Sequence, residues 1–259
     1  MSDPGSYSTY PEYPLTGRAR LAYNWIPPGA RSLLDAGCAW GYATRFFAEK
    51  CPETSGLEVR DYVKIAQQRY PHIAFYQGGL ESTPFVDASF DVVVMGDVLE
   101  HVDDEIVALD EIARILRPGG TFIVTTPHRG LFSWLDPNNY GYSLMKTSPA
   151  LYRLAYRLKH GAAPSSAVGS VQHRHYSIGD FRSMLDHSRF RGNYRIKKVF
   201  RSSLLIEPLL QNVTVIAEAF IGRCALLRPL DALGNIDYRI PYGPLAYNIA
   251  LRIVKTDNN

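Results

Sequence analysis

A carboxylate and two glycines stand close together near the start of the chain: Asp35, Gly37 and Gly41. The residues before them, Arg31 to Ala36, are a short apolar run that predicts a buried strand, and Tyr42 to Lys50 has the apolar spacing of a helix. Small residues in such a turn let the backbone approach a ligand, and the helix N-terminus offers free N–H groups and positive charge. We therefore expect a ligand site at this turn.

A second carboxylate, Glu58, lies in the next predicted strand, Thr54 to Val59, 17 residues beyond Gly41. A carboxylate at that place can accept hydrogen bonds from the hydroxyls of a ribose. The turn lacks the G-x-G-x-x-G spacing that clears the pyrophosphate of a dinucleotide, and Asp35 would repel that group. The same carboxylate attracts a cation. The pattern thus favours a positively charged nucleoside and disfavours a nicotinamide-dependent oxidoreductase.

Strands and helices alternate beyond this pair. The predicted strands are Ile73 to Gln77, Phe90 to Met95 and Thr121 to Thr126, and the predicted helices are Asp61 to Tyr70 and Glu105 to Leu116, the latter stopped by Arg117-Pro118-Gly119-Gly120. This order predicts an α/β fold, with a Rossmann-like, mostly parallel seven-stranded sheet covered by helices on both faces.

The later part of the chain completes the predicted sheet. It offers helices at Ala150 to Lys159 and Ser177 to Leu185, strands at Arg195 to Ser202 and Ile249 to Lys255, and an apolar helical insert at Leu204 to Tyr242. We divide the chain into an N-terminal arm and lid (1–30), a nucleoside-binding core (31–128) and a region of the same domain with the acceptor lid, the last strands and the insert (129–259).

Charge is uneven, although the net charge of the 259 residues is only +3. Residues 50–128 hold 6 Lys or Arg and 13 Asp or Glu, whereas residues 129–204 hold 13 and 3. The basic span suggests an anionic acceptor or surface, or a merely solvated face. Three spaced cysteines without a CxxC pair and an N-terminus without an apolar signal region favour a cytoplasmic protein, with peripheral contact to the inner face of a membrane left open.

Three segments, in order, resemble motifs of the class I S-adenosylmethionine-dependent methyltransferases of the type 11 kind. They are Leu34-Asp35-x-Gly37-x-x-x-Gly41, then Phe90-Asp91-Val92-Val93 followed by Val98-Leu99-Glu100-His101-Val102, and Leu116-Arg117-Pro118-Gly119-Gly120. The resemblance implies S-adenosylmethionine as cofactor, with S-adenosylhomocysteine as product. The cofactor-binding residues that it implies are Asp35, Gly37, Cys38, Ala39, Gly41, Glu58, Gly79, Leu80, Asp97 and Val98.

The sequence departs from the resemblance at two places. Many relatives carry Gly-Asp after the third strand, with the Asp reaching the adenine, whereas this chain has Gly78-Gly79 followed by Leu80 and Glu81. We therefore expect the adenine to be read by backbone or by Glu81. The middle glycine of the first motif is replaced by Ala39.

Methyl transfer to a hydroxyl needs a base, and histidine titrates near neutral pH. The candidates are His128, which follows the fifth predicted strand, His101 in the fourth-strand motif, and His173 in the segment that also holds His175. A structural role for His101, as a cap on the following helix, is an equal alternative. No metal site is predicted, because the third and fourth ligands that His173 and His175 would need are not evident in the sequence.

The acceptor is expected to be a small or a lipid- or glycan-linked molecule methylated at oxygen, because residues 129–204 are basic and residues 204–242 apolar. The aromatic run Leu131 to Tyr142 is expected to be a lid over it, and Tyr10 and Tyr13 could close over the cofactor. The alternatives are an RNA methyltransferase that holds phosphates with the basic span, which the dispersed Lys and Arg and the lack of an RNA-binding module disfavour, and a non-catalytic protein with the same fold. No oligomeric state follows from the sequence.

Overall fold

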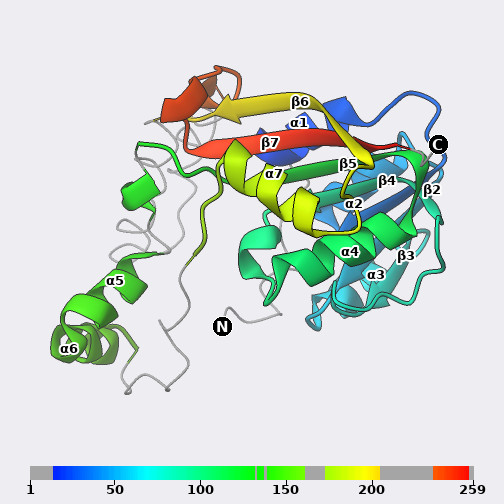
Figure 1. The fold of residues 1–259 in the computed structure, drawn as a ribbon. Coiled ribbons are helices and arrows are strands. Elements are labelled where there is room, and N and C mark those ends of the chain that lie inside the picture. Colours follow the sequence, from blue (N-terminus) through cyan, green and yellow to red (C-terminus); the bar gives the residue numbers. More distant parts are fainter. Residues whose placement is uncertain (1–13, 132, 137–138, 161–172, 205–235, 257–259) are drawn as a thin grey trace. The chain divides into compact units, whose positions relative to one another are not determined.

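The computed structural model describes residues 14–131, 133–136, 139–160, 173–204 and 236–256. They contain a seven-stranded sheet in the order β3-β2-β1-β4-β5-β7-β6 (Figure 1). The strands are β1 (Ser32–Ala36), β2 (Glu53–Glu58), β3 (Ala74–Gln77), β4 (Phe90–Gly96), β5 (Leu116–Pro127), β6 (Tyr194–Ser202) and β7 (Asn248–Lys255). β1 is parallel to β2 and β4, β2 to β3, and β4 to β5. The predicted Rossmann-like, mostly parallel sheet is confirmed.

Helices cover both faces of this sheet (Figure 1). The helices on the sheet are α1 (Gly17–Trp25), α2 (Tyr42–Ala48), α3 (Tyr62–Arg69), α4 (Glu105–Ile115) and α7 (Ile178–His187). The described residues also form α5 (Tyr140–Thr147), α6 (Pro149–His160) and the short 3-10 turns η2 (Leu99–His101), η3 (Ser133–Leu135) and η6 (Gly243–Leu245). Neighbouring residues of a strand point to opposite faces. Leu34 accordingly packs in a cluster with α4 and α7, and Leu33 in a cluster with α1 and α2.

Side-chain caps fix where two of these helices begin. The Asp104 carboxylate accepts from the backbone N–H groups of Ile106 and Val107 at 2.8 and 3.1 Å at the start of α4. Ser177 and Asp180 form a reciprocal capping box at the start of α7, where the sequence predicts a helix. Each cap satisfies N–H groups that have no partner inside the helix.

Strand β5 begins at Leu116, earlier than the predicted start at Thr121. The segment Arg117 to Gly120, predicted as a turn before the strand, therefore lies within it. Phe90 pairs with Leu116 and Val92 with Thr121, so the chain between the two pairings bulges out of the ladder. Pro118 has no N–H to donate, and Gly119 has a φ of +76°, which breaks regular pairing. A further difference is α1, which the sequence analysis does not predict and whose buried residues include Ala22 and Trp25.

The chain divides into two compact units, Met1–Thr126 with Tyr176–Phe200 and Ile249–Asn259, and Pro127–His175 with Arg201–Asn248. We call them the first and the second unit. Tyr10, Tyr13 and most of the predicted insert, residues 205–235, lie outside the described residues. Within the described part of the chain, no helix is long and apolar enough to cross a membrane.

Helix α4 offers a test of the core. Leu109 is fully buried in the cluster beneath the sheet, whereas Val107 on the same helix is 40% exposed. We expect Leu109→Ala to lower the free energy of unfolding by about 2–5 kcal/mol, because it leaves a cavity. Val107→Ala, the matched control, is expected to cost less than about 1 kcal/mol, as measured by denaturant unfolding. Equal losses would contradict this packing.

Candidate functional site

The turn after β1 is held by hydrogen bonds to the neighbouring strand. The N–H groups of Gly37 and Cys38 donate to the Leu57 carbonyl at 2.8 and 3.0 Å, and the Gly41 N–H donates to the Cys38 carbonyl at 2.9 Å. Gly37, Ala39 and Gly41 have φ of +88°, +46° and +78°, so three residues of the turn lie in the left-handed region. The predicted strand–turn–helix is therefore present, and its sharpness depends on small residues.

Gly37 is required for a second reason, which is close approach. A Cβ atom at this position would lie 2.2 Å from Cγ2 of Val98, just after β4. β1 and β4 are adjacent and parallel, so their carboxyl ends meet at one edge of the sheet. This contact brings together two predicted cofactor residues from separate segments.

Glu58, at the end of β2, is tied to the same turn. One carboxylate oxygen accepts from the Ala39 N–H at 3.1 Å and the other from the Arg60 N–H at 2.8 Å. Each oxygen has two lone pairs, so the carboxylate keeps capacity to accept from hydroxyl groups. Only 8% of Glu58 is exposed. The carboxylate is thus held in one orientation beside the turn, as a ribose-binding group requires.

Asp35 lies beneath the turn and is 5% exposed. Its carboxylate accepts a 2.6 Å hydrogen bond from Thr44 Oγ1, in the first turns of α2. Burial raises the pKa of Asp35 from 3.8 to about 7; the Thr44 hydrogen bond opposes the rise, and the charge of Glu58 adds to it. A cation beside Asp35 would lower the pKa again, because it stabilises the ionised carboxylate.

Asp97 follows β4 with a φ of +57°, an unusual conformation for a residue other than glycine. Its N–H donates to the Thr125 carbonyl at 2.9 Å, and its carboxylate accepts from Thr125 Oγ1 at 3.3 Å. The Arg18 guanidinium, from α1, forms an ion pair with Asp97 at 2.9 Å. α1 therefore reaches the carboxyl edge of the sheet.

The two predicted residues after β3 stand beside the end of β2. The Gly78 N–H donates to the Glu58 carbonyl at 3.0 Å, which carries the chain on to Gly79 and Leu80. Leu80 is buried in the core. A Cβ at Gly79 would lie 2.5 Å from a carboxylate oxygen of Glu81, so this acid lies over Gly79. The carboxyl ends of β1, β2 and β4 and the segment after β3 thus gather the ten predicted cofactor residues.

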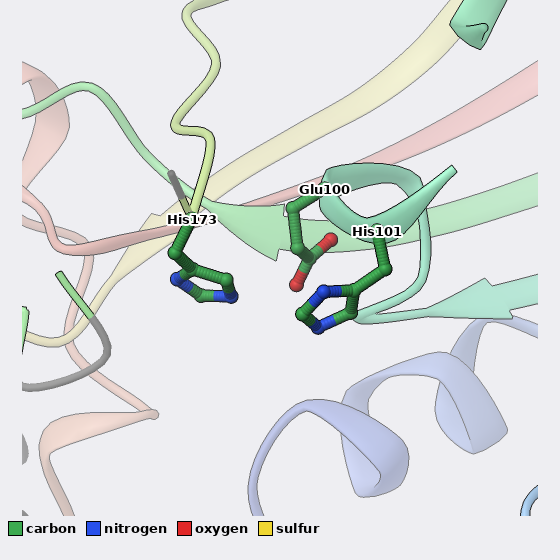
Figure 2. Close-up of side chains that lie close together, drawn as sticks. All are labelled: Glu100, His101 and His173. Atoms are coloured by element: carbon green, nitrogen blue, oxygen red, sulfur yellow. The ribbon is translucent and has the colours of Figure 1, made fainter. Parts of the chain in front are cut away.

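The candidate bases differ in their surroundings. Figure 2 shows Glu100 and His101 on η2, and His173 on the extended segment before Tyr176. Glu100 is buried and accepts from Thr126 Oγ1 at 2.9 Å, whereas His101 is exposed. Both belong to the first unit, and His173 belongs to the second.

His128 is buried in the second unit. Its backbone N–H donates to the Tyr247 carbonyl at 2.7 Å, and its Nδ1 lies 2.9 Å from the Ala246 carbonyl. Because a carbonyl only accepts, Nδ1 carries the proton and a neutral ring has its lone pair on Nε2. This tautomer is the one in which Nε2 can act as a base.

His173 is placed by an acidic residue that the sequence analysis does not single out. Its Nδ1 lies 2.5 Å from Oδ2 of the fully buried Asp136, and His175 Nε2 lies 3.1 Å from the same oxygen. Asp136 is 37 residues from His173, and no local pattern links the two. Thr44 and Arg18 also contact predicted site residues, although the sequence does not single them out. Of the two, only Thr44 lies near the motif in sequence, because it stands in the first turn of the helix that follows Gly41.

The structure has a mostly parallel sheet with a glycine turn after β1, an acid closing β2 and a further acid after β4. This is the arrangement that the resemblance to the class I S-adenosylmethionine-dependent methyltransferases implies. A family model described as "Methyltransferase domain" matches residues 34–124. Residues 34–124 are therefore similar to a methyltransferase domain.

Curated relatives match the same part of the chain. A Mycolicibacterium smegmatis protein named "Probable S-adenosylmethionine-dependent methyltransferase" is 40% identical over 104 residues, 40% of this chain and 40% of that protein. Malonyl-(acyl-carrier protein) O-methyltransferase of Serratia marcescens is 33% identical, covering 42% and 43%. Demethylmenaquinone methyltransferase of Bacillus licheniformis is 34% identical, covering 38% and 45%. The chain thus spans less than half the length of these relatives.

A solved structure supports the fold over a longer range. The YcgJ protein from Bacillus subtilis aligns with 93% of this chain and 99% of that chain, at a TM-score of 0.55 and 17% identity. At this identity the likeness concerns the fold alone.

Gly37 allows a direct test of the turn. We expect Gly37→Ala to weaken S-adenosylhomocysteine binding by roughly tenfold or more, because the new methyl group displaces Val98 and strains the left-handed backbone. Gly119→Ala is the matched control: its φ is +76°, but nothing lies within 4 Å of its Cβ position. Calorimetry measures both affinities. Equal weakening in the two variants would show that general backbone strain, and not the contact with Val98, is responsible.

The raised pKa of Asp35 predicts opposite pH effects on folding and on binding. The unfolded chain ionises Asp35 near 3.8 and the ligand-free folded chain near 7, so the free energy of unfolding should fall across this range and level off above it. A cationic ligand favours the ionised form, so binding of S-adenosylmethionine should strengthen as the pH rises through about 7, by at most about tenfold per pH unit.

Asp35→Asn is the variant that isolates these effects, since the amide does not titrate. Calorimetry from about pH 6 to about pH 8, compared between the two proteins, separates the Asp35 contribution from the ligand's own titration. An identical pH slope in the variant would rule out Asp35 as its origin.

Proposed function

We propose that the chain is an S-adenosylmethionine-dependent methyltransferase. The observation that carries the proposal is the pair of fixed carboxylates, Asp35 and Glu58, on either side of the turn after β1. S-adenosylmethionine, when bound, supplies a methyl group activated on a sulfonium. Asp35 would face its cationic methionine end, and Glu58 would accept from its ribose hydroxyls. Asp97 and Val98, Cys38 to Gly41, Gly79 and Leu80 would complete the site.

The chain's own part in the reaction is positioning and proton removal. In-line transfer of an activated methyl group gains most from holding the acceptor in place. His128 has the tautomer that a base needs, His173 is oriented by Asp136, and His101 is exposed on η2. Each remains a candidate base for a hydroxyl acceptor. Residues 1–30 are the proposed arm and cofactor lid, and residues 129–259 hold the proposed acceptor lid together with the last strands and the insert.

The acceptor that we favour is a small or lipid-linked molecule methylated at oxygen. In the second unit, Leu131 and Trp134 are 62% and 69% exposed, and Leu151 and Leu154 on α6 are 52% and 54% exposed. Leu151 and Leu154 are three residues apart and so share a helix face, and their neighbour Arg153 is exposed too. Exposed apolar side chains beside a cation suit an amphipathic anionic acceptor or peripheral contact with a membrane.

Two relatives support this class of acceptor. One is named as an O-methyltransferase of a malonyl group on acyl-carrier protein, and the other as a methyltransferase of demethylmenaquinone. The basic span 129–204 is what favours the alternative, an RNA acceptor. A non-catalytic role for the domain is the remaining alternative.

Binding is tested with Glu58→Ala. Because the variant loses a buried hydrogen-bond acceptor, its affinity for S-adenosylhomocysteine, measured by calorimetry, is expected to be roughly 10- to 100-fold weaker. Glu53→Ala is the matched control, because Glu53 opens the same strand but is exposed. Thermal unfolding of both variants checks the fold. Wild-type protein that does not bind S-adenosylhomocysteine, or full affinity in Glu58→Ala, would contradict the proposal.

Activity is tested by incubating the full chain with methyl-labelled S-adenosylmethionine and separate lipid, small-molecule and RNA fractions. We expect the label in the lipid or small-molecule fraction. It should be base-labile if the product is a methyl ester and base-stable if the product is a methyl ether. Label recovered in RNA alone would overturn the acceptor proposal but support the enzyme. Binding without transfer to any fraction would favour the non-catalytic alternative.

A further inference from the structure

The second unit contains a cluster of one carboxylate and two imidazoles outside the predicted cofactor site. Asp136 follows η3, and His173 and His175 lie on the extended segment 37 and 39 residues later. One ligand atom from each of the three residues lies within 4.8 Å of the others. Asp136 therefore supplies a third possible ligand atom beside the histidine pair.

We propose that Asp136, His173 and His175 form a site for a divalent transition-metal ion of the Zn²⁺ class. Two imidazoles and one carboxylate are a usual ligand set for such ions, whereas Mg²⁺ and Ca²⁺ favour oxygen ligands. The ligand atoms are Asp136 Oδ2, His173 Nδ1 and His175 Nε2. A fourth position is left for water.

The two distances from Asp136 Oδ2 fit this assignment with a small adjustment. Ligands about 2.0–2.2 Å from a tetrahedral ion lie about 3.3 Å from one another. His175 Nε2 is already 3.1 Å from Asp136 Oδ2, whereas His173 Nδ1 is 2.5 Å away, the length of a strong hydrogen bond. Metal binding at Nδ1 would replace that hydrogen bond and leave the neutral ring with its one proton on Nε2. It would widen the distance between His173 Nδ1 and Asp136 Oδ2 by less than about 1 Å.

The surrounding contacts hold the ligands before any ion binds. Asn139 accepts from the His173 N–H at 2.8 Å and donates to the His173 carbonyl at 2.9 Å, so it clamps this backbone in both directions. The His175 carbonyl accepts a hydrogen bond from Arg129 at 3.4 Å. The His175 ring contacts the Tyr247 ring edge-on. Backbone contacts of this kind orient ligands and raise metal affinity.

Burial explains why an ion would be favoured. Asp136 is fully buried, and the side chains of His173 and His175 are 11% and 9% exposed. A buried carboxylate is costly unless a positive charge compensates it, and a divalent ion does so while using the lone pairs of both rings. A protonated histidine is the competing explanation, which the experiment below separates.

The test uses the full chain, stripped with a chelator and titrated with Zn²⁺ and with Co²⁺, whose visible absorption reports the ligand geometry. We expect about one ion per chain, a visible spectrum typical of four-coordinate Co²⁺, and thermal stabilisation by Zn²⁺. Asp136→Asn and His175→Gln should each weaken binding by roughly 100-fold or more.

His72→Gln is the matched control, because it also removes one histidine, but an exposed one. It should change affinity by less than about twofold. Failure of the wild-type chain to bind either ion, or equal binding by wild type and both ligand variants, would overturn the site and leave a hydrogen-bonded His–Asp–His cluster. No readout involves methyl transfer, so failure of this site and failure of the proposed function are distinguishable. A bound ion would remove His173 from the candidate bases, because the ring would then carry its proton on Nε2.

Discussion

The contact between Gly37 and Val98 is the constraint on which the nucleoside site depends. It forces two segments that follow different strands to within van der Waals distance, and no side chain larger than hydrogen fits between them. Because β1 and β4 are adjacent, this contact sets how closely the turn after β1 and the segment after β4 approach. Glu58 then ties the third segment to the turn through the Ala39 N–H.

The sheet and the cofactor side of the site could be predicted from the sequence because their signals are local. Apolar runs, the glycine turn, and an acid at the end of the next strand each reflect geometry within a few residues, so the sequence alone predicts that Asp35 and Glu58 lie at this turn. Helix α1 was missed because its apolar face is short, although Trp25 is buried against the sheet.

The side chains that orient the functional groups could not be predicted, for a physical reason. Arg18 is about 80 residues from Asp97, and Asp136 is 37 from His173. Such pairs are formed by the topology of the sheet and by loop paths, which leave no periodic trace in the chain. The sequence therefore names the groups that bear charge but not those that hold them in place.

The left-handed backbone at Asp97 bears on how the domain could be redesigned. A non-glycine residue with this φ raises the energy of the folded chain by about 1 kcal/mol or more, which glycine would relieve. Glycine would also remove the carboxylate that pairs with Arg18 of α1 at the sheet edge. A search for thermostable variants would thus select glycine at this position, and the added stability would come with a change in the geometry of the site.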